Sequence, residues 1–222
     1  MEKTGTTTPE RILQAAGEIF GREGFKAATI RRIAEAADAN VAAINYHFRD
    51  KEGLYAAVLE NLFSQCLTKF PADMGLGPDP SVQDRLKALI RAMLHRLLSN
   101  EGWAGLSGQG KLIAREFLEP TPSFEPIIEK YIRPQKNILL GIVEEILGQE
   151  APTGIKISCC LSIIGQCIYY ALGAPMIRKV TNHSSPAEEN IELLAEFVWQ
   201  FSLGGVMQIK ENLNSESVTS PL

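Results

Sequence analysis

The sequence predicts an all-α fold, and three observations lead to that prediction. Apolar residues recur at spacings of three and four along most of the chain, which places them on one face of successive helices. Two of these stretches open with a capping box, a side-chain pattern typical of helix N-termini. No stretch alternates apolar and polar residues over the length of a strand, and no internal repeat is present. We therefore expect helices throughout.

The first 70 residues are expected to form four helices. A capping box from Thr7 to Glu10 opens the first helix, whose apolar face continues to Gly24. Two short helices follow, and only residues 38–40 separate them. A longer helix then runs to the Gly- and Pro-rich segment 71–80, the expected joint between two units. The expected N-terminal caps of the four helices are Thr7, Thr29, Asn40 and Asp50.

Beyond residue 80 the same periodicity predicts five further helices. Ser81 and Asp84 form the second capping box, and a Gly-rich stretch at 102–110 follows the helix that they open. These helices are expected at 81–98, 112–118, 124–147, 155–172 and 187–212. The expected domains are a helix-turn-helix domain at 1–53 with a disordered leading tail, a helical domain at 54–212 and a disordered tail at 213–222.

Composition and charge narrow the class of protein. Of the 222 residues, 45% are apolar and 22% are charged, which suits a folded core and excludes a disordered or collagen-like chain. The net charge is −4, and the first 60 residues carry eight basic against nine acidic residues, so bulk charge does not indicate a nucleic-acid binder. The N-terminus lacks the pattern of a secretory signal peptide. We therefore expect a cytoplasmic protein.

The cysteines and histidines form no pattern typical of a metal site or a disulfide framework. The three histidines are scattered, and no C-x-x-C pair or G-x-S-x-G motif is present. We expect reduced thiols, no metal, no cofactor and no catalytic residue. The four cysteines are Cys66, Cys159, Cys160 and Cys167.

Residues 29–51 hold the features that point to function. Two short capped helices joined by a three-residue turn and packed on a preceding helix can place the second helix in the major groove of DNA. The same spacing also fits an ordinary corner of a three-helix bundle. Residue types favour DNA, because Arg31 and Arg32 open the second helix and phosphate-contacting types gather near the end of the third. These are Asn45, Tyr46, His47, Arg49 and Lys51.

Two stretches carry a resemblance to a known family, TIRRIAEAA at 29–37 and INYHFRDKEGL at 44–54. They look like parts of the N-terminal domain of TetR-type repressors, and the match spans about residues 9–59. In the second stretch the family's pattern of an aliphatic residue, two variable positions, His or Tyr, Phe, two further positions, Lys, Glu and Leu occurs at full spacing. The resemblance implies a helix-turn-helix protein that binds double-stranded operator DNA.

The resemblance also implies roles for single residues. Val41, Ala42 and Ala43 occupy base-facing positions, where small apolar side chains can approach thymine methyl groups. His47 and Lys51 occupy positions that usually contact phosphate. We therefore expect the third helix to be the DNA-reading helix.

Other positions leave alternatives open. Asn45 stands where the family commonly has Tyr, so the backbone contact made by that Tyr is shifted to Tyr46 or lost. Arg31 can reach a guanine edge or be a solvated charge. His47 can also interact with the helix dipole, and Lys51 can be a surface lysine. The full set expected at the DNA is Thr29, Arg31, Arg32, Val41, Ala42, Ala43, Asn45, Tyr46, His47 and Lys51.

Residues 157–177 contain no formal charge, and Lys156 and Arg178 flank them. The run is long enough to span a membrane, but polar residues and a proline interrupt it, and no second span exists. A helix that is apolar all round equally suits burial between its own core and a partner subunit. The resemblance implies dimerisation through the last two long helices, about 155–173 and 187–210. We therefore expect a homodimer and no membrane association.

The stretch from Arg115 to Pro134 also looks like the CecR-like branch of the same family. We expect the C-terminal half to bind a small-molecule effector. Aromatic and sulfur-containing side chains with a few polar groups line such sites, although core packing is the stronger explanation of each candidate. Arg115 or Glu116 can orient a polar ligand. The candidate pocket residues are Met93, Trp103, Arg115, Phe117, Tyr131, Cys167 and Tyr170.

The interpretation that the sequence favours is a repressor that binds a palindromic operator as a homodimer and is released by a small ligand. One alternative is a redox-sensing regulator using Cys159, Cys160 or Cys167, although buried thiols are usually inert. The other is a nucleotide-binding enzyme, because residues 105–112 approach a P-loop pattern. There Leu112 replaces the Ser or Thr that binds magnesium, and no strand precedes the loop.

Overall fold

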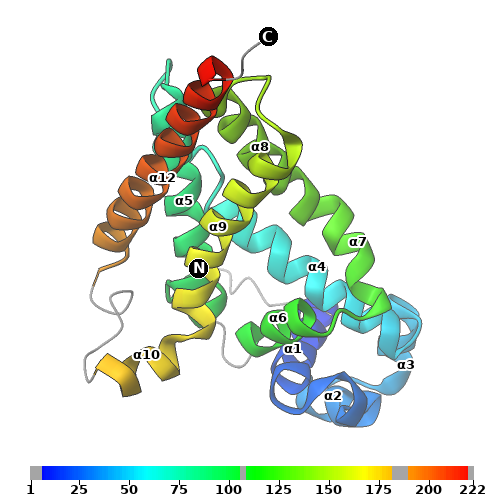
Figure 1. The fold of residues 1–222 in the computed structure, drawn as a ribbon. Coiled ribbons are helices and arrows are strands. Elements are labelled where there is room, and N and C mark those ends of the chain that lie inside the picture. Colours follow the sequence, from blue (N-terminus) through cyan, green and yellow to red (C-terminus); the bar gives the residue numbers. More distant parts are fainter. Residues whose placement is uncertain (1–6, 106–108, 182–189, 220–222) are drawn as a thin grey trace.

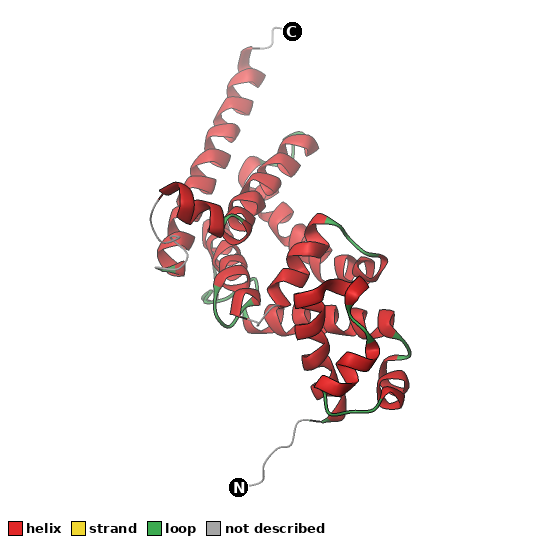
Figure 2. Cartoon of the chain, turned by 90° about the horizontal axis from the view of Figure 1, so that it is seen from below, coloured by secondary structure: helices red, strands yellow, loops and turns green. Residues whose placement is uncertain are grey.

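The computed structural model describes residues 7–105, 109–181 and 190–219, and every regular element in these ranges is helical (Figure 1, Figure 2). The prediction of an all-α fold is therefore confirmed. The first helices are α1 (Thr8–Ala27), α2 (Ile30–Ala36), α3 (Val41–Phe48) and α4 (Lys51–Lys69). They are followed by α5 (Val82–Leu98), η1 (Trp103–Gly105), α6 (Gln109–Leu118), η2 (Pro122–Phe124), α7 (Glu125–Ile127), η3 (Ile128–Ile132), α8 (Arg133–Leu147), α9 (Thr153–Leu172), α10 (Ala174–Thr181) and α12 (Ile191–Thr219).

Side chains cap the short helices at the positions that the sequence predicts. Asn40 Oδ1 accepts a hydrogen bond from the Ala43 amide at 2.6 Å, and Asp50 Oδ1 accepts one from the Gly53 amide at 2.7 Å. These bonds satisfy amide groups that an α-helix leaves unpaired in its first turn. The start of α3 and the start of α4 are therefore fixed by residues only ten positions apart.

The buried apolar side chains form two cores. The first core is built by α1, α2, α3 and α4, and side chains from α6, η2 and α7 complete it. The second core joins α5, α8, α9 and α12. Segment 71–80, the predicted joint, connects α4 of the first core to α5 of the second. Figure 1 shows α6 beside α1, although α6 follows α5 in the chain. A later segment of the chain thus packs against the first helix.

The region from 109 to 147 differs from the sequence prediction. Helix α6 begins at Gln109 instead of Leu112, and the single helix expected at 124–147 is divided into η2, α7, η3 and α8. Pro134 explains the π-helical segment η3, because proline lacks an amide hydrogen and its ring displaces the carbonyl one turn earlier. The Arg133 amide accordingly donates to the Ile128 carbonyl, five residues back.

The segment after α9 contains a helix that the sequence did not predict. Helix α10 (Ala174–Thr181) occupies a stretch that we expected to be a loop. Pro175 lies in its first turn, where helix amides have no intrahelical partner and proline is tolerated. The expected start of the last helix at 187 lies outside the described residues. Helix α12 begins at Ile191, and Asn190 Oδ1 accepts from the amide of the second helical residue at 2.9 Å.

The end of the chain is also more helical than predicted. Residues 213–219 continue α12, where we expected a disordered tail. Asn and Ser are weak helix formers, which is why the sequence indicated an end at 212. Elongating an existing long helix adds one hydrogen bond for each residue that is ordered, so a few weak residues do not stop it. The expected tail residues 1–6 and 220–222 lie outside the described part of the chain.

Candidate functional site

The turn between α2 and α3 is held by hydrogen bonds to both α1 and α2. Asp38 adopts a left-handed backbone conformation with φ of 47°, which Asp tolerates better than most residues. The Ala39 amide donates to Ala34 O at 3.0 Å, and Arg11 Nη2 donates to Asp38 O at 3.2 Å. These bonds fix the direction of α3 relative to α1.

Helix α3 presents one face to the core and the other to solvent. Ile44 is fully buried and Phe48 is half-buried, and both pack in the first core. Val41 and Tyr46 are exposed to 42% and 84%, although burying such apolar surface is favourable. Ala43, predicted to face the bases, is half-buried against the core. The exposed residues of α3 are Val41, Ala42, Asn45, Tyr46 and His47.

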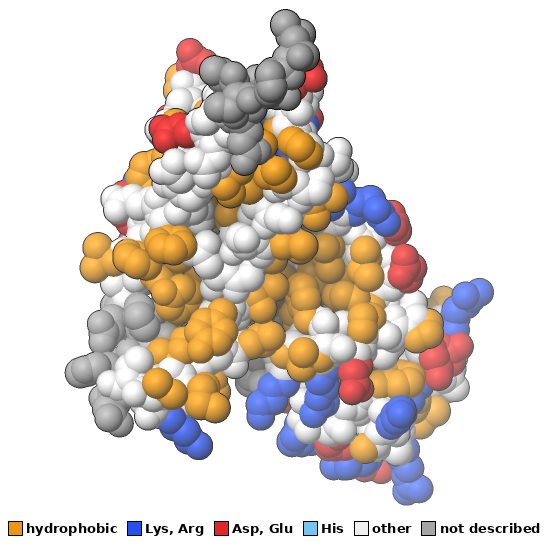
Figure 3. All heavy atoms as spheres, in the orientation of Figure 1, with side chains coloured by type: hydrophobic (Ala, Val, Ile, Leu, Met, Phe, Trp, Pro, Cys, Tyr) orange, Lys and Arg blue, Asp and Glu red, His pale blue; other side chains and the backbone are white. Residues whose placement is uncertain are grey.

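The predicted residues of α2 lie beside α3, and two of them are arginines with exposed heads. Arg31 Nε donates to Glu35 Oε1 at 3.2 Å on the same helix. Arg32 Nη1 donates to Glu23 Oε2 of α1 at 2.7 Å, so this guanidinium is oriented by a neighbouring helix. The Thr29 hydroxyl accepts a hydrogen bond from the Arg32 amide at 3.4 Å as the cap of α2. Figure 3 shows Lys and Arg side chains gathered at this end of the molecule.

The junction between α3 and α4 is held by close contacts. Lys51 Nζ donates to Lys26 O at 3.3 Å and lies 4.6 Å from the centroid of the Phe25 ring. Lys51 is therefore half-buried on α1 and is not a free surface lysine. A Cβ atom at Gly53 would lie 2.2 Å from Phe48 O. Sequence reasoning missed this role of Gly53, although a glycine within a helical turn disfavours helix formation and signals such a constraint.

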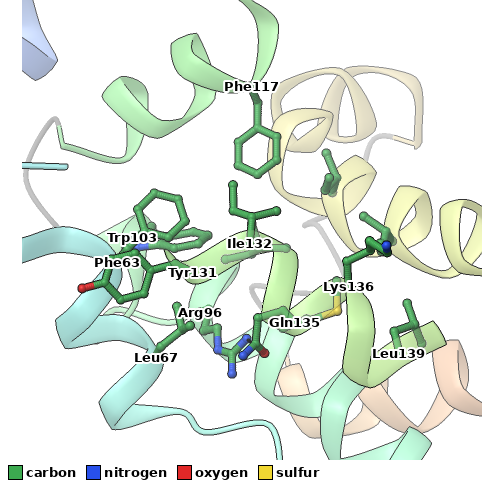
Figure 4. Close-up of a pocket in the computed structure, with 14 residues that line it drawn as sticks. Phe63, Leu67, Arg96, Trp103, Phe117, Tyr131, Ile132, Gln135, Lys136 and Leu139 are labelled. Carbon is green, nitrogen blue, oxygen red and sulfur yellow. Dashed lines mark hydrogen bonds between the residues drawn. The ribbon is translucent and has the colours of Figure 1, made fainter. Parts of the chain in front are cut away.

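A pocket of about 130 Å³ opens between α4, α5, η1, α6, η3, α8 and α9. Four of the predicted pocket residues line it, namely Met93, Trp103, Phe117 and Tyr131. Phe63 of α4 contacts this group, with its ring centroid 4.8 Å from that of Trp103 and 6.0 Å from that of Tyr131. Figure 3 shows an apolar hollow between α9 and the segment of α7 and α8, and Figure 4 shows the lining side chains.

Three predicted pocket residues lie elsewhere. Cys167 is fully buried in the second core, and Tyr170 packs against that core. Ile164, on the neighbouring face of α9, lines the pocket instead. Arg115 is exposed, and its Nη1 donates to Phe20 O of α1 at 3.3 Å. Periodicity placed these residues on helices but could not show which face each helix turns to the pocket.

A different arginine, which sequence reasoning missed, lies at the pocket. Arg96 is only 4% exposed, and its Nε donates to Phe70 O at 2.7 Å while its Nη1 donates to Gln135 Oε1 at 2.9 Å. Its Nη2 has no hydrogen-bond partner. Burial lowers the pKa of Arg96 to about 10, so the side chain stays charged at neutral pH. The sequence did contain a signal for the burial of Arg96, because this residue follows Leu89 by seven positions and so lies on the apolar face of the same helix.

A buried polar network joins α4 to α6. The Tyr55 hydroxyl donates to Glu116 Oε1 at 2.5 Å, and the Thr121 amide donates to Glu116 Oε2 at 2.8 Å. Glu116 is 1% exposed, so these bonds replace the water that the carboxylate loses. Burial and the neighbouring carboxylate raise the pKa of Tyr55 well above its usual value. Glu116, a candidate ligand contact in the sequence, instead ties α6 to the first core.

Helices α9 and α12 carry an exposed apolar strip, visible in Figure 3. Phe197 and Phe201 of α12 stack on each other with centroids 6.4 Å apart and are both more than half exposed. By length and composition α9 could cross a membrane, but the core helix of a soluble protein passes the same test. The strip consists of Ile157, Leu161, Tyr169, Leu172, Leu193, Phe197, Phe201 and Met207.

All four cysteines are buried, and their thiol pKa values are raised. Burial raises the pKa of Cys66 and of Cys160 to about 11 and that of Cys167 to about 12, and it also raises that of Cys159. Within the described ranges no group of three His, Cys, Asp or Glu side chains could hold a metal ion. Residues 106–108 of the P-loop-like stretch lie outside those ranges.

Family models match two parts of the chain. Residues 12–58 match the model of bacterial regulatory proteins of the tetR family, and these residues contain α2, α3 and the junction to α4. Residues 82–206 match the C-terminal domain of the HTH-type transcriptional dual regulator CecR. The second match covers more than half of the chain.

Curated relatives and solved structures agree with these matches. The transcriptional dual regulator CecR of Shigella flexneri is 29% identical in an alignment of 208 positions that covers 87% of this chain and 89% of that protein. The probable regulator YttP of Bacillus subtilis is 26% identical over 63% of this chain and 64% of its own length. The fatty acid degradation regulator FadR from Bacillus halodurans has a similar fold, with a TM-score of 0.63 at 18% identity over 88% of this chain and 97% of that one. A tetR-family regulatory protein from Rhodococcus RHA1 gives a TM-score of 0.63 at 22% identity over 91% and 98%.

Proposed function

This chain belongs to the TetR family of bacterial transcriptional regulators, with a C-terminal domain of the CecR type, and we propose that it is a homodimeric repressor released from its operator by a small ligand. The observation that carries the proposal is the exposed face of α3. Val41, Ala42 and Tyr46 point away from the core on a helix whose start is capped and whose turn is hydrogen-bonded to α1. Such a helix can enter the major groove without rearrangement.

The apolar strip on α9 and α12 supports the dimer. Large exposed apolar patches mark association surfaces, and a two-fold axis lets one strip pack on its own copy. The strip lies on α12, which packs along α5, and α5 contributes to the pocket. A dimer assembled through this strip would present two α3 helices to successive major grooves of a palindromic operator.

The ligand response is supported by the position of α4. Phe63 and Leu67 near the end of α4 line the pocket. At its other end, α4 is capped by Asp50 and follows α3 directly. The Tyr55 bond to Glu116 ties the same helix to α6, which carries Phe117 into the pocket. A ligand that pushes on Phe63 or Phe117 would therefore tilt α4 and change the separation of the two reading helices.

Thermodynamic linkage between ligand binding and operator binding limits how far a ligand can weaken operator binding. A ligand shifts the equilibrium only by its differential affinity for the two spacings, and a coupling of about 1 to 3 kcal/mol corresponds to roughly 5- to 150-fold weaker operator binding. Operator DNA must weaken ligand binding by the same factor.

The proposal is tested by enriching duplexes from a random pool with the full-length protein and measuring binding of the enriched duplex by fluorescence anisotropy. We expect a palindromic site and an affinity that falls steeply as salt rises. Ala42→Glu should weaken binding more than about a hundredfold, because it places a negative charge against DNA at an exposed helix position. The matched control is Asn137→Glu, which adds the same charge at an exposed position of α8. A pool without an enriched site, or equal effects of both variants, would contradict the proposal.

Repression is tested separately with a reporter gene placed behind the enriched site. Expression of the protein should lower reporter output, and Ala42→Glu should restore it. A rise in output on expression of the wild-type protein would show activation and would overturn the repressor assignment without affecting the DNA-binding surface.

A further inference from the structure

Arg96 is a buried cation without a counter-ion. In the described part of the chain its partners are a main-chain carbonyl, Phe70 O, and a neutral amide, Gln135, and its Nη2 donates to nothing. A charged group removed from water is costly unless an opposite charge compensates it, and unsatisfied buried donors are rare in folded proteins. The guanidinium fork is therefore satisfied only in part by the protein itself.

A second cation lines the same pocket. Lys136 follows Gln135 on α8, and none of the ion pairs among the described residues involves Lys136 or Arg96. Figure 4 shows Arg96 and Gln135 side by side, with Lys136 on the α9 side of them and Phe117 at the opposite end of the pocket. Two cations, Arg96 on α5 and Lys136 on α8, therefore contribute to the lining of the pocket.

Apart from Gln135, the rest of the lining is made of aliphatic, methionine and aromatic side chains. Phe63, Trp103 and Tyr131 form one wall, and Phe117 lies above them (Figure 4). The volume of about 130 Å³ is similar to that of a dry engineered cavity of about 150 Å³ that holds a single benzene ring. The pocket therefore suits a ring-sized apolar body whose polar end reaches the two cations.

We propose that this pocket binds an organic monocarboxylate, with its apolar body among the aromatic side chains and its carboxylate paired with Arg96 and Lys136. A carboxylate matches the planar guanidinium fork in a bidentate manner and supplies the missing counter-charge. A neutral ligand would leave Nη2 unsatisfied, and a cationic ligand would be repelled. The inference rests on the proposed function only in taking this pocket as the effector site.

The test uses calorimetry at pH 7 with the full-length protein and matched probes. The probes are the ω-phenylalkanoates from phenylacetate to 6-phenylhexanoate, each compared with the primary alcohol of the same length. We expect at least one acid to bind roughly ten- to a hundredfold more tightly than its alcohol, the range expected for hydrogen bonds to charged groups. Equal affinities at every chain length, or no binding by any probe, would overturn the proposal.

Variants assign the preference to the two cations. Arg96→Met should reduce the preference of acid over alcohol to less than about threefold, because it keeps the apolar volume and removes the fork. Arg91→Met removes an arginine from the same helix outside this pocket, where it pairs with Glu192, and should keep the preference. A preference that survives in Arg96→Met would overturn the assignment of Arg96.

Lys136 offers a variant on an exposed position that does not endanger folding. Lys136→Glu should weaken binding of the acids by roughly tenfold and leave the alcohols unchanged, because a like charge then faces the carboxylate. An equal effect on acids and alcohols would contradict the proposed charge pairing, even if Arg96→Met does not fold.

Operator release is measured separately by anisotropy with the same probes. Acids that bind with the expected preference but do not release the operator would leave the carboxylate site intact and contradict the proposed ligand response. Release by alcohols as effective as release by acids would contradict the carboxylate site and leave the proposed response intact.

Discussion

The first four helices and the helices beyond them differ in whether they bury charged side chains. From α1 to α4 no charged side chain is buried, and the polar side chains Asn40 and Asp50 lie at helix starts. Beyond α4 the molecule buries Arg96, Glu116 and Lys156, each at least 94% removed from solvent. A charge buried in this way contributes little to stability by itself.

Under the proposed function, the difference separates a rigid DNA-reading unit, α1 to α4, from a unit that responds to a ligand. Caps and apolar packing give α1 to α4 one arrangement, which suits a surface that must fit a fixed groove. Buried charges persist where they position a ligand or couple elements, and Arg96 and Glu116 lie at the pocket and at the α4 to α6 contact. The following predictions test this comparison, from the largest expected effect to the smallest.

The first prediction concerns assembly, which the comparison assigns to the C-terminal half. Phe201→Glu places an unpaired charge in the apolar strip of α12, and burying it in a dimer interface costs about 3 to 5 kcal/mol. We expect the dimer dissociation constant to rise more than a hundredfold, as measured by analytical ultracentrifugation. Leu118→Glu, at an equally exposed leucine on α6, is the control and should leave the dimer unchanged. An unaltered dimer in Phe201→Glu would place the interface elsewhere.

The second prediction concerns a variant that disrupts the close packing at the junction between α3 and α4. Gly53→Ala forces a Cβ atom to within 2.2 Å of Phe48 O, and a backbone carbonyl cannot move aside as the end of a flexible side chain can. We expect a loss of about 2 to 3 kcal/mol in the free energy of unfolding, measured by urea denaturation. Gly141→Ala lies in α8 with nothing within 4 Å and should gain up to about 1 kcal/mol from helix propensity. Similar values for the two variants would show that the junction is not tightly packed.

The third prediction concerns the bond that joins the two regions. Tyr55→Phe removes the donor to buried Glu116 without changing the volume, and we expect a loss of about 1 to 2 kcal/mol in the free energy of unfolding. Tyr46→Phe, at a tyrosine that is 84% exposed, should change that free energy by less than about 0.5 kcal/mol. A ligand that releases the operator should also do so less effectively in Tyr55→Phe. Equal stabilities of the two variants would contradict a role for this network.

The smallest expected effect is at the cysteines. The raised pKa values of Cys66, Cys160 and Cys167 mean that about one thiol in a thousand or fewer is ionised at pH 8, and all are buried. Titration of the native protein with a thiol reagent should therefore modify almost none of the four cysteines, whereas the urea-unfolded protein should react at all four. Rapid modification of the folded protein would revive the redox-sensing alternative.

The unit formed by α1 to α4 could be predicted from local features of the sequence. Caps at Asn40 and Asp50, the three-residue turn and the apolar positions Ile44 and Phe48 all act between residues close in the chain. They determined that α3 exists, where it starts and which of its faces is buried. The half-buried state of Ala43 and of Lys51 depends on packing against other helices, and the sequence did not reveal it.

The pocket could be predicted from the sequence only in part, because residues from distant segments between 63 and 168 line it. The sequence identified aromatic candidates such as Trp103 and Phe117 by type, but it selected Arg115 as the polar group. The structure places Arg96 there instead, since helix rotation decides which arginine faces the pocket.

The sequence by itself determined the family and the all-α class and predicted which helix faces DNA, because these follow from helical periodicity, caps and a continuous motif. Only the tertiary structure decided that α6 packs against α1, that Glu116 ties α4 to α6 and that Arg96 is left without a counter-ion at the pocket. Each of these depends on contacts between residues that are distant in the chain, and such contacts are set by how whole helices pack, which no local pattern encodes.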